Sequence, residues 1–120
     1  MRLLIDTKDI TFRVEGLAKP RPDYRDKSGK TQATTSDEDG RRPIWTVRLG
    51  AIDNQRKTKE TIFVEVAGIE PRLTFDGDAQ VFELVYAPWV GKDGKIKRAF
   101  RATSVTDASA APSGKSVQAA

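Results

Sequence analysis

Basic and aromatic side chains are interleaved along several segments of this sequence, and that combination could bind a single-stranded nucleic acid. Such a ligand needs positive charge along its phosphate backbone and flat rings against which its unstacked bases can stack. The basic candidates are Arg13, Arg25, Lys27, Lys30, Arg48, Lys97 and Arg101, and the aromatic candidates are Tyr24 and Phe63. We expect these residues to form a nucleic-acid-binding site.

Several of these candidates also have a simpler explanation. Lys97 and Arg101 alternate along one segment, as they would on any strand with a solvent-facing side. Phe63 is predicted to point away from the apolar neighbours on its strand, so it could bind a base, pack under a loop or contact a second copy. Tyr24 lies in a basic segment without apolar neighbours, which favours binding. Trp45 shares a predicted face with apolar residues, so we expect it in the core.

The composition excludes several kinds of active site. The chain has 120 residues and contains neither Cys nor His, which excludes a thiol nucleophile, a disulfide, a Cys/His zinc site and a Ser-His-Asp triad. The acidic cluster Asp37, Glu38 and Asp39 could hold a divalent cation, but its spacing does not match a calcium loop. We expect no enzyme activity, metal, cofactor or small-molecule substrate.

The positive charge is unevenly distributed along the chain. The chain has 21 Lys and Arg residues against 17 Asp and Glu residues, a formal charge of +4. Many ordinary domains carry as much, so the total does not identify a nucleic-acid-binding protein. The excess is concentrated in residues 13–30 and 92–101, which leaves the remainder of the chain net negative. This segregation favours an anionic partner.

Alternation of apolar and polar residues predicts β-structure throughout the ordered part of the chain. The predicted strands are residues 9–17, 43–53, 59–67, 80–89 and 95–105, each with a period of two. Residues 80–89 are apolar on both faces, which predicts a central strand. Pro71 disfavours a long helix between the third and fourth strands. We therefore expect five strands and in effect no helix.

Five strands in one small domain must protect their edges, and closure into a barrel is the commonest solution. We expect an all-β, five-stranded OB-like barrel formed by residues 1–105, with a small open sandwich as the alternative. Residues 20–42 are predicted to form a long mobile basic hairpin, and residues 106–120 a disordered tail, because neither can bury much apolar surface. No apolar run is long enough to cross a membrane, and Asp6 interrupts the stretch that a signal peptide would continue, so we expect a cytoplasmic protein.

The layout of these segments resembles the single-stranded DNA-binding proteins of the filamentous-phage gene V type. It is also similar to small replication-associated proteins of plasmids and integrative elements. The segments that carry the resemblance are Asp26-Lys27-Ser28-Gly29-Lys30, Ile44-Trp45-Thr46-Val47-Arg48-Leu49, Phe63-Val64-Glu65-Val66, Gln80-Val81-Phe82-Glu83-Leu84 and Gly91-Lys92-Asp93-Gly94. The resemblance implies an OB-like barrel, a homodimer, and cooperative, largely sequence-independent coating of single-stranded DNA during replication or transfer.

The resemblance also implies roles for individual residues. Tyr24, Lys27 and Lys30 match the basic hairpin of that family, which uses Lys, Arg and a stacking aromatic ring. Three features depart from the family pattern: Gln32 stands where an aromatic residue often follows, the 91–94 turn has no aromatic tip, and the acidic cluster at 37–39 is unusual.

We therefore expect a homodimeric single-stranded DNA-binding protein without catalysis or membrane association. Arg13, Arg48, Lys97 and Arg101 would line the groove, Tyr24 and Phe63 would stack bases, and Arg25, Lys27 and Lys30 would hold the strand from the basic hairpin. One alternative is a protein-interaction or structural module of a phage or mobile element, with Phe63 and Trp89 as interface anchors. Another is a replication regulator that binds duplex DNA through a β-ribbon, since no helix is available for the major groove. The choice between DNA and RNA stays open.

Overall fold

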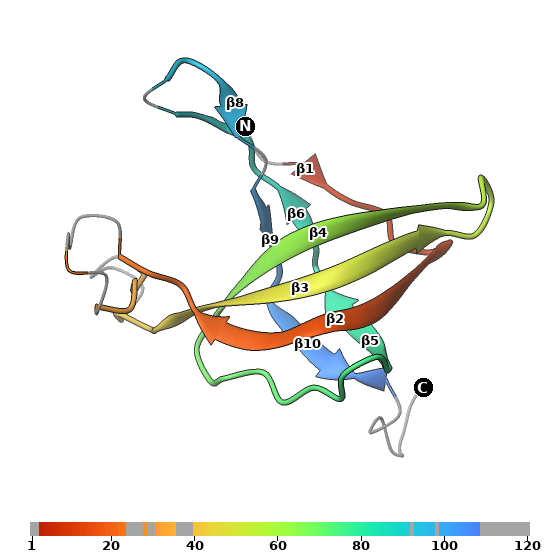
Figure 1. The fold of residues 1–120 in the computed structure, drawn as a ribbon, viewed down its shortest axis with the longest axis horizontal. Coiled ribbons are helices and arrows are strands. Elements are labelled where there is room, and N and C mark those ends of the chain that lie inside the picture. Colours follow the sequence, from red (N-terminus) through yellow and green to blue (C-terminus); the bar gives the residue numbers. More distant parts are fainter. Residues whose placement is uncertain are drawn as a thin grey trace.

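The computed structural model describes residues 3–23, 28, 31–35, 40–91, 93–97 and 99–108, apart from the side chains of Trp89 and Lys97. Within these ranges all regular structure is β, without an α-helix (Figure 1). The described residues therefore contain no helix that is long and apolar enough to span a membrane. The prediction of an all-β chain is confirmed.

Three long antiparallel strands form the largest layer of the molecule. They are β2 (Ile10–Pro20), β3 (Ile44–Asp53) and β4 (Thr58–Ala67), with β3 in the middle. The predicted alternation is confirmed, because Val14, Val47, Leu49 and Val64 all point to one face and are the largest fully buried side chains. The opposite face of these strands contacts solvent.

The C-terminal half is divided more finely than the sequence predicts. The two predicted strands of residues 80–89 and 95–105 are replaced by six short strands: β5 (Asp78–Phe82), β6 (Val85–Tyr86), β7 (Trp89–Val90), β8 (Ile96–Lys97), β9 (Phe100–Arg101) and β10 (Ser104–Asp107). Glu83 has a φ of 54°, a left-handed conformation that ends β5. Pro88 has no N–H to donate between β6 and β7. The prediction of one continuous central strand at 80–89 is therefore wrong.

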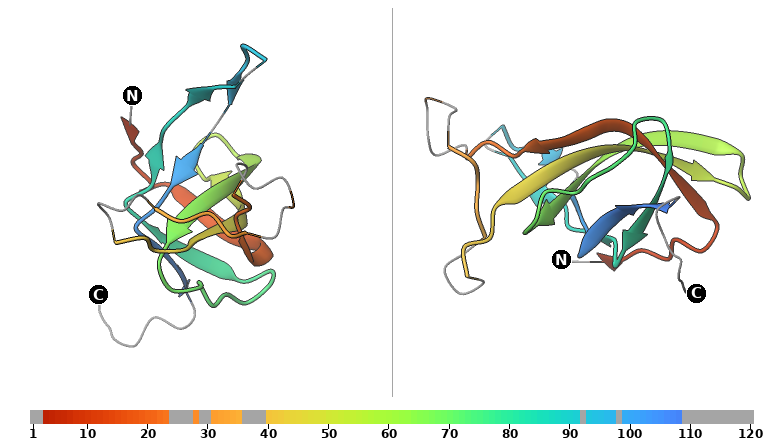
Figure 2. Two further views of the ribbon diagram at one scale, coloured as in Figure 1. Left: turned by 90° about the vertical axis from the view of Figure 1, so that its left-hand side faces the viewer. Right: turned by 90° about the horizontal axis from the view of Figure 1, so that it is seen from below.

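Eight of the strands form one mixed sheet in the order β1-β6-β9-β4-β3-β2-β5-β10, where β1 is Leu3–Leu4. β4 and β9 are parallel, and the other pairs are antiparallel. β5 and β6 follow each other in the chain but lie near opposite ends of this order, so the sheet curves strongly (Figure 2). The sheet is not closed into a barrel, because β1 and β10 remain its outermost strands.

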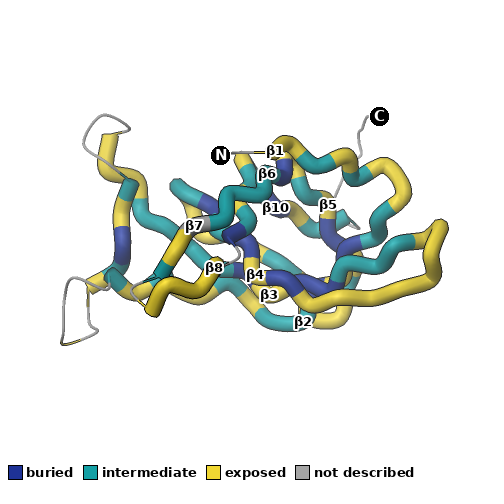
Figure 3. The backbone as a smooth tube through the Cα atoms, turned by 90° about the horizontal axis from the view of Figure 1, so that it is seen from above, coloured by how far each residue is buried: buried dark blue, intermediate teal, exposed yellow. Residues whose placement is uncertain are grey.

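The hydrophobic core lies on the inner side of this curved sheet. The buried residues of β2, β3 and β4 pack against Ala79 of β5, Leu84 after β5 and Val105 of β10. Figure 3 shows the buried positions gathered along the middle of these strands, while the turns at their ends are exposed. β10 extends to Asp107, so the sheet continues two residues past the domain end expected at 105.

The segment between β2 and β3 is not the single long hairpin that its composition predicts. Residues 31–35 pair on two sides, through the bridges Pro22↔Gln32 and Thr34↔Pro43. The buried Ala33 receives a backbone hydrogen bond from Ile44 at 2.9 Å and donates one to the carbonyl of residue 21 at 2.7 Å. We call residues 20–23, 31–35 and 42–44 the loop stem. Through the two antiparallel bridges, the three parts of the stem lie side by side at the start of β3 (Figure 1).

Candidate nucleic-acid interface

The solvent side of β2, β3, β4 and β9, which we call the outer face, carries several of the predicted site residues. Side chains alternate across a pleated sheet, so Arg48 lies opposite the buried neighbours Val47 and Leu49. Arg48 and Phe63 are direct partners across β3 and β4. Phe63 is 58% exposed, so the prediction that its ring points outward is confirmed.

Glu15 places a carboxylate on the outer face at a β-bulge in β2. Val14 pairs with Leu49, and Gly16 pairs with Arg48, so Glu15 is the extra residue of the bulge. The carboxylate of Glu15 lies over Gly50, where a Cβ atom would be only 2.6 Å from its Oε2 atom. Gly50 therefore provides the space that Glu15 occupies, and any larger residue there would displace it.

Glu15 collects three partners from β3 and β4. Lys59 Nζ lies 3.0 Å from Oε2, Thr61 Oγ1 donates a hydrogen bond of 2.8 Å to Oε1, and Arg48 Nε lies 3.6 Å from Oε1. The hydrogen bond from Lys59, followed by that from Thr61, lowers the pKa of Glu15 below its ordinary value of 4.5, against a smaller opposing effect of desolvation. Glu15 is therefore ionised at neutral pH.

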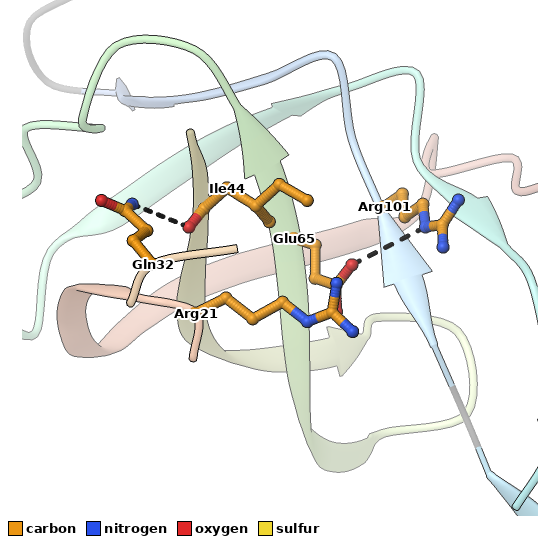
Figure 4. Close-up of polar contacts among 5 residues, drawn as sticks. All are labelled: Arg21, Gln32, Ile44, Glu65 and Arg101. Atoms are coloured by element: carbon orange, nitrogen blue, oxygen red, sulfur yellow. Dashed lines mark hydrogen bonds and ion pairs between the residues drawn. The ribbon is translucent and has the colours of Figure 1, made fainter. Parts of the chain in front are cut away.

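Glu65 holds a second pair of cations at the other end of the outer face. Its Oε2 atom lies 3.2 Å from Arg21 Nε in the loop stem, and its Oε1 atom lies 3.7 Å from Arg101 Nε on β9 (Figure 4). Gln32 donates from Nε2 to the carbonyl of Ile44 at 2.9 Å, which fixes the stem beside this cluster. Glu65 thus links the loop stem to β4 and β9.

Each predicted arginine of the outer face is already close to a carboxylate. Arg13 lies 3.6 Å from Asp78, Arg48 pairs with Glu15, and Arg101 pairs with Glu65. The guanidinium groups are about half exposed, so each pair is worth roughly 1 kcal/mol or less. A phosphate can therefore compete for these arginines. The carboxylates hold them along the face but reduce the net charge that the sequence suggested.

The remaining predicted residues do not join this face in the described structure. Tyr24, Arg25, Lys27 and Lys30 lie outside the described residues. The sequence places Lys97 on the same strand face as Arg101, but the backbone of Lys97 pairs with Trp89 in a separate two-stranded sheet. The prediction that Lys97 and Arg101 lie on one continuous strand is wrong, because Lys97 belongs to β8 and Arg101 to β9, which are in different sheets.

Three basic residues at the β3–β4 turn were missed by the sequence analysis. Arg56, Lys57 and Lys59 form the run Arg56-Lys57-Thr58-Lys59, which follows a polar turn between two strands. Three positive charges within the four residues 56–59 were the signal that could have identified them. Lys59 is also the principal partner of Glu15, which sequence alternation alone could not reveal.

Metal binding finds no support among the described residues. They contain no group of three or more acidic side chains that could hold an ion. The acidic cluster Asp37, Glu38 and Asp39 lies outside the described residues.

Comparison of the chain with family models, with curated proteins and with solved structures found no match. Function is therefore inferred from the outer face itself.

The pH dependence of stability is expected to report the Glu15 cluster. Because the pKa of Glu15 is lower in the folded chain than its ordinary value of 4.5, its ionised form stabilises the fold above that pH. This contribution is lost as the pH falls below 4.5 and through the folded-state pKa. Glu15→Gln should be less stable than the wild type at neutral pH and lose less stability on acidification. Denaturant unfolding at pH values of about 7, 5, 4 and 3 checks this, and parallel losses in both proteins would contradict it.

Proposed function

We propose that this chain binds single-stranded DNA, largely without sequence preference, in support of the replication or transfer of a phage, plasmid or integrative element. The observation that carries the proposal is the exposed ring of Phe63 beside Arg48 in the middle of the outer face. This ring lies on a central pair of long strands and is not part of the hydrophobic core of the described residues. Every base has a face that can stack on such a ring, so this contact tolerates any sequence.

The residues around Phe63 suit this role. Its diagonal neighbours on β3 are Thr46 and Gly50, which are too small to cover the ring. Arg48 and Arg101 flank it and can exchange a carboxylate oxygen for a phosphate oxygen, since their present pairs are weak. A strand could therefore stack one base on Phe63 while its neighbouring phosphates contact arginines on both sides.

The strand connectivity supports an interrupted OB-like barrel as the underlying fold. In OB folds the second and third strands form the binding face, and the loops after the first and fourth strands border it. If β2, β3 and β4 are the first three strands, the bordering elements here are the loop stem and the β7–β8 hairpin. Both project beyond the sheet on the same side of the molecule in Figure 1. The parallel pairing of β4 with β9 and the return of β5 to β2 fit the same connectivity.

Fluorescence anisotropy with labelled oligo-dT tests the proposal. The oligonucleotide should exceed roughly 16 nucleotides, the upper end of the range that one OB fold covers, and a duplex of equal length is the matched control. We expect binding to the single strand that weakens with salt, with a log–log slope of about −0.7 for each neutralised phosphate. Preference for the duplex would favour a β-ribbon regulator. Absence of binding to either ligand at low salt would overturn the proposal and favour a protein-interaction module.

A further inference from the structure

The turn between β3 and β4 carries two cations, Arg56 and Lys57, that pair with none of the described carboxylates. Residues 54–60 are exposed throughout (Figure 3). Arg56 and Lys57 take part in no ion pair with the described residues, in contrast to Arg13, Arg48 and Arg101. Unlike those arginines, they can bind a phosphate without first giving up a carboxylate.

Two acidic residues beside this turn, Asp53 and Asp9, form hydrogen bonds that hold it in place. Asp53 Oδ1 accepts hydrogen bonds from the backbone N–H groups of Gln55 at 3.0 Å and Arg56 at 3.1 Å. Asp9 Oδ2 accepts one from Gln55 Nε2 at 2.7 Å, and the backbone carbonyl of Asp9 accepts one from the Asn54 N–H at 2.9 Å. These carboxylates shape the turn rather than pair with its cations.

The turn is tied to neighbouring strands, so its cations are presented on a fixed backbone. Asn54 Nδ2 donates to Thr11 Oγ1 on β2 at 2.9 Å, and the Lys57 N–H donates to the carbonyl of Asp53 at 2.8 Å. Lys57 adopts a φ of 60°, which places it in the left-handed conformation that closes the turn. A preorganised cationic turn loses less conformational entropy on binding than a flexible one.

The position of the turn makes it continuous with the outer face. β3 and β4 end in this turn, which projects past the start of β2 at the end of the sheet opposite the loop stem (Figure 1). Lys59, two residues after Lys57, contacts Glu15, which in turn contacts Arg48 beside Phe63. The ten residues of β3 span roughly 33 Å between the stem and the turn.

From these observations we propose that Arg56 and Lys57 form a phosphate-binding site at the end of the outer face, which takes the backbone of a single strand as it leaves Phe63. The inference rests on the proposed function and adds the direction of the strand, along β3 and β4 from the loop stem to the turn. It also predicts that part of the salt dependence of DNA affinity comes from the turn, in addition to any part that comes from the carboxylate-paired arginines.

The variant Arg56→Gln/Lys57→Asn tests this site, because asparagine tolerates the left-handed conformation of residue 57. Its matched control is Arg72→Gln, which removes an exposed arginine from the segment 68–77, away from the turn along the lower edge of Figure 1. Anisotropy titrations with labelled oligo-dT over a series of salt concentrations should give a slope shallower by about 1.4 for the turn variant. Its affinity at low salt should fall several-fold, and Arg72→Gln should bind like the wild type.

A turn variant that binds with wild-type affinity and slope would overturn this site while leaving the proposed function in place. An equal effect per charge removed in Arg72→Gln would also overturn it, because general charge rather than the turn would then determine affinity. Failure of the wild-type chain to bind oligo-dT would instead overturn the proposed function. Arg56→Gln alone, which leaves residue 57 unchanged, serves as the second variant and should lower the slope by about 0.7.

Discussion

Replacing Leu49 with alanine is expected to lower the free energy of unfolding by about 3 kcal/mol, within the range of about 2–5 kcal/mol for buried leucines. Leu49 is 0% exposed and lies in the middle strand of the meander, between Val14 on β2 and Ile62 on β4. Its removal would leave a cavity that three strands border and that none can fill without losing its register. Urea denaturation followed by circular dichroism measures this loss.

Leu17→Ala is the matched control for this experiment. Leu17 lies on β2 but is 53% exposed, so its truncation removes the same atoms with little loss of buried surface. We expect a change below about 1 kcal/mol. Equal destabilisation by the two substitutions would contradict the assignment of the core to the inner side of the curved sheet.

The long strands could be predicted from the sequence because their burial is one-sided. Alternation in β2, β3 and β4 reflects a pleated layer with one buried face, and it also identified Phe63 as an outward ring. The breaks in the C-terminal half could not be predicted in the same way. Glu83 is an ordinary residue in a left-handed conformation, and only its tertiary surroundings determine that φ.

The structure of the loop stem also could not be predicted from amino-acid composition. Residues 20–42 contain little apolar surface, which predicts a segment without fixed structure. The described part is instead organised by backbone hydrogen bonds on both sides of residues 31–35, with the small Ala33 buried between them. Backbone pairing of this kind leaves almost no trace in residue type, because every non-proline residue has the same donor and acceptor.

The sequence predicted where the charged residues of the outer face lie, but not which residues they contact. Arg48 and Arg101 lie on the solvent side as expected, but Glu15 meets Arg48 through the pairing of β2 with β3, and Glu65 meets Arg101 through the parallel pairing of β4 with β9. Neither strand pairing follows from local alternation. A site that looked uniformly basic in the sequence therefore contains a row of arginines held by carboxylates, and Arg56 and Lys57 at the β3–β4 turn have no ion pair with the described residues.

Phe63→Ala is expected to weaken binding of oligo-dT by roughly fivefold to 150-fold, because stacking of one base on an aromatic ring contributes about 1–3 kcal/mol. The fold should be little affected, since the ring is 58% exposed and contributes little to the core. The salt slope should stay at the wild-type value, because no phosphate contact is removed. This combination separates a stacking role from an electrostatic one.

Phe82→Ala is the matched control for Phe63→Ala, because it removes an exposed aromatic ring that lies away from the outer face. Phe82 lies on β5, lines a groove with Ile69 and Ser104, and is 45% exposed. It should leave affinity for oligo-dT unchanged. Phe63→Trp should retain or strengthen binding, while Phe63→Leu, which keeps apolar bulk but no ring, should resemble Phe63→Ala. If leucine bound as well as phenylalanine, Phe63 would act as a general apolar contact, and the stacking role on which the proposed function rests would be wrong.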